Sequence, residues 1–83
     1  MTIDADALIK AVRACNVVGE LARADNVSAM LSPIAGRRWD HNTVADDLAE
    51  LESHGKLKRA QGFEWEGSEP LPKTRIAYVL PGD

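Results

Sequence analysis

Few residues in the sequence have the types and the spacing that catalysis or metal binding requires. The two histidines, His41 and His54, and the single cysteine, Cys15, are not spaced as the ligands of a zinc site are. The sequence has no glycine-rich phosphate loop after a strand and no nucleophile elbow. We therefore expect no enzyme activity, no cofactor and no bound metal.

Carboxylates cluster at one place, where Asp46, Asp47 and Glu50 lie close together in the chain. Acid–base catalysis by neighbouring carboxylates needs surroundings that push their pKa values apart, and the sequence supplies no pocket or apolar partner for this. The three residues are instead expected to form an acidic face on a helix. Such a face repels phosphate and would suit a basic protein partner.

Basic residues flank this acidic stretch on both sides. Cations at such positions could make enough phosphate contacts for salt-sensitive binding to a nucleic acid. A solvated turn is the alternative interpretation of the arginine pair, and it stays open. The candidates for phosphate contact are Arg37, Arg38, Lys58, Arg59, Lys73 and Arg75.

The chain that positions these residues is expected to begin with helices. Over residues 4–15, Leu8, Val12 and Cys15 recur at helical spacing, and Asp4 suits the positive end of the helix dipole. Cys15 lies on this apolar stripe and is expected to pack there as a small hydrophobic residue.

The next segment predicts two short helices, about 17–24 and 27–32. Ser32 and Pro33 resemble a cap followed by a proline in a first helical turn, and Gly36 ends the segment. Trp39 follows the arginine pair and is expected to belong to the core.

The clearest helix covers residues 43–54. Thr43 to Asp46 fits a capping box in which aspartate replaces the usual glutamate, and Gly55 fits the left-handed residue that ends a helix. The apolar positions recur at i, i+4 and i+7 and give one buried stripe, Val44, Leu48 and Leu51.

After Lys56 the apolar pattern changes from helical to alternating, which predicts strands. A glycine and two prolines in residues 67–73 mark a loop between two alternating runs. Residues 57–80 are therefore expected to form a β-hairpin with a long tip, and Leu57 is expected to meet the helical stripe. The inner side of the hairpin is expected to carry Phe63, Trp65, Ile76, Tyr78 and Leu80.

The order of these elements, and the segment TVADDLAELESHGKLKR at residues 43–59, resemble the winged helix-turn-helix of bacterial or phage transcriptional regulators. The resemblance implies an α+β fold with three to four N-terminal helices, a recognition helix at about 43–54 and a wing at about 57–80. It also implies that the start of the recognition helix enters the DNA major groove, while the wing reaches the backbone or the minor groove. The chain departs from the family pattern at three positions expected to face the groove, Asp46, Asp47 and Glu50. At Asp46 and Glu50 relatives often carry arginine or lysine.

Carried over to this chain, the resemblance gives a set of expected DNA contacts. Asn42 and Thr43 stand at the groove-entering end and are expected to influence sequence preference. His41 could donate to a base or a phosphate, with a solvated loop histidine as the alternative. The expected DNA-binding residues are Arg37, Arg38, His41, Asn42, Thr43, Asp46, Lys58, Arg59, Lys73 and Arg75.

The composition sets bounds on all of these interpretations. The 83 residues give room for one domain, taken as 1–83, and 45% hydrophobic with 28% charged residues is ordinary for a globular protein. A net charge of −3 opposes binding of nucleic acid through bulk charge but permits a local basic patch. A single cysteine, no signal peptide and no stretch long enough to span a bilayer indicate a cytoplasmic protein without membrane contact.

Two functions are compatible with the sequence. The first is a transcriptional regulator that binds double-stranded DNA, in which a homodimer is expected. The alternative is a winged-helix interaction module whose acidic helix face, Asp46, Asp47 and Glu50, contacts a basic protein partner. Fold alone does not decide between them.

Overall fold

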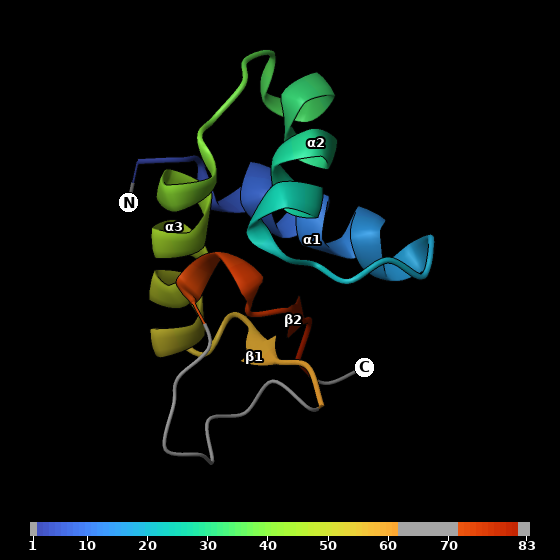
Figure 1. Ribbon diagram of the computed structural model, residues 1–83, viewed down its shortest axis with the longest axis vertical. Helices are drawn as coiled ribbons and strands as arrows, with labels where there is room; N and C mark the ends of the chain where they lie inside the picture. Colours follow the sequence, from blue (N-terminus) through green and yellow to red (C-terminus); the bar gives the residue numbers. More distant parts are fainter. Residues whose placement is uncertain (1, 62–71, 82–83) are drawn as a thin grey trace.

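Three helices and a short antiparallel hairpin make up the computed structural model, which describes residues 2–61 and 72–81 (Figure 1). Helix α1 (Ala5–Val17) packs against α2 (Ala24–Ala35) and β2 (Tyr78–Val79). Helix α3 (His41–Ser53) packs against α2 and against η1 (Lys73–Arg75), a short 3-10 helix. This confirms the predicted α+β order of helices followed by a hairpin. The elements are α1 (Ala5–Val17), α2 (Ala24–Ala35), α3 (His41–Ser53), β1 (Lys58–Arg59), η1 (Lys73–Arg75) and β2 (Tyr78–Val79).

Helix α1 begins where the sequence predicts. The Asp4 side chain accepts a hydrogen bond from the Ala7 backbone N–H at 3.1 Å, and so satisfies one of the donors that a helix start leaves unpaired. Gly19 turns the chain out of the helix with a left-handed φ of 79°. The N–H of Glu20 then donates to the Cys15 carbonyl at 2.9 Å, as in the Schellman arrangement.

The prediction of a helix at 17–24 is wrong. Because Gly19 ends α1, the following residues leave the helix and approach the hairpin. Ala22 forms an isolated antiparallel bridge with Tyr78, whose N–H donates to the Ala22 carbonyl at 3.2 Å. The apolar residues whose spacing suggested a helix are exposed instead: Val17, Val18 and Leu21.

Helix α2 is longer than the predicted 27–32, since it starts three residues earlier, at Ala24, and ends at Ala35. Ser32 and Pro33 resemble a helix start in the sequence, but both lie inside α2 near its C-terminus. Gly36 ends the helix as predicted, with a left-handed φ of 73°. Three helices, and not four, therefore precede the hairpin in the described part of the chain.

Helix α3 confirms the predicted helix at 43–54 but begins two residues earlier, at His41. The predicted capping box from Thr43 to Asp46 is wrong, because Asp40 is the capping residue. The predicted end is confirmed. Gly55 is left-handed with φ of 76°, and the N–H of Lys56 donates to the Leu51 carbonyl at 2.9 Å.

The hairpin pairs Lys58 with Val79 and Arg59 with Tyr78. The expected inner side is confirmed at Tyr78 and at Ile76, which are both buried. Ala77, expected on the outer side, is buried as well, so the alternation is incomplete. The expected tip and its aromatic residues Phe63 and Trp65 lie outside the described residues.

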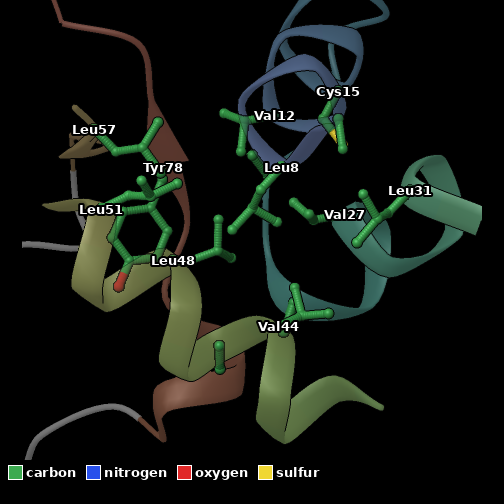
Figure 2. Close-up of a cluster of buried hydrophobic side chains, with 14 of the residues drawn as sticks. Leu8, Val12, Cys15, Val27, Leu31, Val44, Leu48, Leu51, Leu57 and Tyr78 are labelled. Carbon is green, nitrogen blue, oxygen red and sulfur yellow. The ribbon is translucent and has the colours of Figure 1, made fainter. Parts of the chain in front are cut away.

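One apolar cluster joins the three helices to the hairpin (Figure 2). Cys15 is fully buried in it, as predicted, and this burial raises the pKa of its thiol, with the Glu20 and Asp25 carboxylates adding to the rise. Trp39 is half-buried and packs against the cluster. The labelled members in Figure 2 are Leu8, Val12, Cys15, Val27, Leu31, Val44, Leu48, Leu51, Leu57 and Tyr78.

The substitution Leu51→Ala tests this packing. Leu51 is 2% exposed, so its truncation should lower the free energy of unfolding by about 2–4 kcal/mol, from lost burial and the cavity left behind. Denaturant unfolding measures the change. Leu21→Ala is the control, because Leu21 is 45% exposed, and equal losses in the two variants would show that α3 is not held by this cluster.

Candidate functional site

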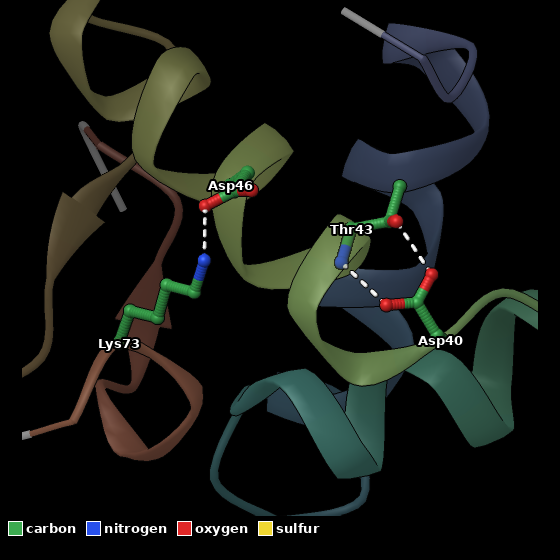
Figure 3. A network of polar contacts seen from close by, with 4 residues as sticks. All are labelled: Asp40, Thr43, Asp46 and Lys73. Carbon is green, nitrogen blue, oxygen red and sulfur yellow. Dashed lines mark hydrogen bonds and ion pairs between the residues drawn. The ribbon is translucent and has the colours of Figure 1, made fainter.

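The start of α3 is fixed by Asp40. One of its carboxylate oxygens accepts the Thr43 backbone N–H at 3.1 Å, and the other accepts the Thr43 hydroxyl at 2.5 Å (Figure 3). These hydrogen bonds, that of the hydroxyl first, lower the pKa of Asp40 below its ordinary value. The Thr43 hydroxyl is thus engaged within the protein, while His41 and Asn42 in the same turn are exposed.

The predicted acidic face is not formed by three exposed carboxylates. Asp47 is only 5% exposed, and its Oδ2 atom accepts the backbone N–H groups of Ile3 at 2.6 Å and Thr2 at 3.1 Å. The expectation that Asp47 faces outward beside Asp46 and Glu50 is therefore wrong. Asp47 instead holds the N-terminal segment against α3, and Ile3 joins the core.

Asp46 is exposed on α3, and it has a basic partner from η1. The Lys73 ammonium lies 2.9 Å from the Asp46 carboxylate, across 27 residues of sequence (Figure 3). Glu50, one turn further along α3, is half-buried. Lys73 is thus brought to the α3 surface as the candidate site requires, but a carboxylate already accepts its hydrogen bond.

The connection between α2 and α3 carries the arginine pair. The Arg37 guanidinium stacks over the Trp39 ring, with its central carbon 3.9 Å from the ring centroid. Ser28 of α2 fixes this connection by donating its hydroxyl to the Trp39 carbonyl at 2.8 Å. Arg37 and Arg38 are both exposed, and neither has an ion-pair partner within residues 2–61 and 72–81.

Two hollows meet at the N-terminal end of α3, and Arg38 and His41 line both. The first, about 260 Å³, lies against α2 and includes Ser28 and Ser32. The second, about 510 Å³, includes Trp39, Asp40 and Asn42. Arg38, His41 and Asn42 therefore lie together around the first turn of α3, where the backbone N–H groups of a helix start also favour anions.

The remaining candidate cations are divided between two places. Arg75 is exposed on η1, which packs against α3. Arg59 is engaged with Glu52, its Nε atom lying 3.2 Å from the carboxylate. Lys58 and Arg59 line a separate groove of about 840 Å³ formed with Glu20 and Leu21. The structure therefore does not bring these two β1 residues to the start of α3.

Within residues 2–61 and 72–81, no group of three or more histidine, cysteine, aspartate or glutamate residues could hold a metal ion. No helix in those ranges is long and apolar enough to cross a membrane.

Comparison with protein-family models, with curated proteins and with solved structures found no match to this chain.

Sequence reasoning missed the structural roles of two aspartates, although signals for both were present. Asp40 stands three residues before Thr43 and directly before the helix, which is the spacing of a capping aspartate. Asp47 lies three residues after Val44 and one before Leu48, so the helical period alone places it on the buried stripe. Both aspartates serve the local structure and hold α3 in place.

Replacement of Asp47 should loosen the N-terminal segment. In Asp47→Ala, two backbone N–H groups lose their acceptor, which should lower the free energy of unfolding by about 1–3 kcal/mol. Hydrogen exchange should also speed up at Ile3. Asp46→Ala removes the same charge from an exposed position and is the control, so equal exchange rates at Ile3 in both variants would contradict the role of Asp47.

The Asp40 cap should give the protein a stability that depends on pH. Since its pKa in the folded protein is below the ordinary 3.8, the cap stabilises the fold above that value and this contribution is lost as the pH falls through the lower, folded value. Asp40→Asn keeps an oxygen that can cap the helix but cannot ionise, so its stability should decline less steeply on acidification than that of the wild type. Unfolding is measured between about pH 2 and pH 6, with Asp6→Asn as control. A parallel decline of Asp40→Asn and the wild type would contradict the contribution of the Asp40 charge.

Proposed function

We propose that the chain is a winged helix-turn-helix domain that binds double-stranded DNA and regulates transcription. In this proposal α2 and α3 are the helix-turn-helix, α3 enters the major groove, and the hairpin is the wing. The observation that carries it is the exposed first turn of α3, where His41 and Asn42 line a hollow together with Arg38 and with Trp39, on which Arg37 stacks.

The arrangement suits duplex DNA because it separates two kinds of contact. Arginines before a helix can bind phosphates on the backbone, while polar side chains in its first turn reach base edges. Asn42 can pair with the edge of adenine through both groups of its amide. Arg75, on η1 at the side of α3, would supply a further phosphate contact from the base of the wing.

Charge segregation supports the same proposal in an acidic protein. The net charge is −3, so binding must rest on a local patch. Arg37, Arg38 and Arg75 are the exposed candidate cations near α3 without an ion pair in the described part of the chain. Three phosphate contacts predict a salt slope of about −2.7, which corresponds to a loss of affinity of roughly 40-fold between 50 and 200 mM salt.

The alternative, a basic protein partner on the acidic helix face, has less support. Asp47 is buried and Asp46 lies 2.9 Å from the Lys73 ammonium, so the face carries less negative charge than three exposed carboxylates would give it. We therefore propose DNA as the partner. The homodimer stays a prediction.

The arginine pair provides the test. Arg37→Ala combined with Arg38→Ala should weaken binding to random duplex DNA and reduce the salt slope by about 1–2. Lys10→Ala combined with Arg13→Ala removes the same charge from the exposed side of α1, and this control should keep the wild-type slope. Fluorescence anisotropy at several salt concentrations measures both.

Two outcomes would contradict the proposal. If the wild type does not bind duplex DNA even at low salt, DNA is not the partner. If the arginine variant and the α1 control lose affinity equally, binding follows net charge and is not located at the start of α3.

A further inference from the structure

The ion pair between Asp46 and Lys73 lies where α3 would meet DNA. Asp46 is in the first half of α3, one turn after Asn42, and Lys73 reaches it from η1 (Figure 3). The side chains are exposed by 63% and 52%, respectively, so solvent and ligands have access to both. The contact is therefore part of the proposed binding surface and not of the core.

Pairing changes what Lys73 can contribute to DNA binding. An unpaired cation that neutralises a phosphate releases a counterion from the DNA, which strengthens binding at low salt. Lys73 next to Asp46 is part of a neutral pair, and a phosphate that takes the ammonium leaves a carboxylate beside the DNA. Exposed ion pairs are weak, so this exchange is feasible when the carboxylate finds another donor.

We propose that Asp46 is a specificity-determining residue of the DNA site. It withholds Lys73 from non-specific phosphate contacts and releases it where the Asp46 carboxylate accepts a hydrogen bond from a cytosine amino group. The inference rests on the proposed function, because it concerns the same surface.

Cytosine is the base that this chemistry selects. A carboxylate only accepts hydrogen bonds, and in the major groove cytosine presents the N4 amino donor. Adenine also presents an amino group, but its N7 acceptor lies beside it and repels a carboxylate. Guanine N7 and O6 and thymine O4 are acceptors, so none of them replaces Lys73 as the partner of Asp46.

The first experiment compares salt slopes on random duplex DNA for four proteins: wild type, Asp46→Asn, Lys73→Ala and the double variant. In the wild type Lys73 is withheld, so Lys73→Ala should leave the slope unchanged. Asp46→Asn should steepen it by about 0.9 and raise affinity on the order of 10-fold at about 50 mM salt. Lys73→Ala in the Asp46→Asn background should remove that added slope.

The opposite pattern overturns the inference. If Lys73→Ala reduces the wild-type slope by about 0.9 while Asp46→Asn does not steepen it, Lys73 binds phosphate without hindrance from Asp46. If the variant lacking Arg37 and Arg38 reduces the slope but Asp46→Asn changes nothing, the proposed function stands and this inference fails. If neither the wild type nor Asp46→Asn binds duplex DNA, both fail.

The second experiment selects preferred duplexes from a random library with the wild type and with Asp46→Asn. The wild type should enrich cytosine at one position, and Asp46→Asn should lose that preference or shift it to adenine, which asparagine pairs with. Identical enriched sequences would overturn the role in specificity. Circular dichroism spectra of Asp46→Asn and Lys73→Ala, which replace exposed side chains, provide the control for folding.

Discussion

Helix α3 is held by an apolar stripe that is buried among α2, the hairpin and the N-terminal segment. Val44, Leu48 and Leu51 are each no more than 2% exposed and belong to the same cluster as Tyr78 (Figure 2). Full burial of such side chains contributes about 1.5–3 kcal/mol each, which is large for a domain with a modest core. Once this stripe faces inward, the opposite side of α3, which carries Asn42, must face solvent.

The polar groups around α3 have different partners on its buried side and on its exposed side. Asp47, on the buried side, is satisfied by backbone N–H groups, and Asp40 closes the start of the helix. The cations that remain near the exposed side differ in their partners: Arg37 stacks on Trp39, whereas Lys73 is held by a carboxylate. A protein of net negative charge can present a phosphate-binding surface only if such local pairing leaves some cations available.

The sequence predicted the parts of the fold that depend on strong local patterns. The sequence predicted both the buried stripe of α3 and its end at a left-handed Gly55, and the structure has both. The segment after α1 was predicted as a second helix because the apolar residues Val17, Val18 and Leu21 keep a helical period, whereas Gly19 and the pairing of Ala22 with β2 decide the geometry. The spacing of apolar residues does not show whether a helix or a sheet will pack beside them.

The candidate site was predictable in position but not in its contacts. The arginine pair and the exposed first turn of α3 follow from the sequence once α3 is recognised. The ion pair between Lys73 and Asp46 does not follow from the sequence, because the two residues meet only through the packing of η1 on α3. The hydrogen bonds of Asp47 could not be predicted either, since its partners are backbone groups of the N-terminal segment, more than 40 residues away in the chain.

A map of backbone amide chemical shifts during titration with a random duplex of about one helical turn would locate the surface that contacts DNA. At low salt, we expect changes at residues 37–46 and 73–75, around the start of α3 and η1. The groove lined by Glu20, Leu21 and Lys58 should show little change. Changes confined to that groove, or no change at all, would contradict the assignment of the start of α3 as a DNA-binding surface.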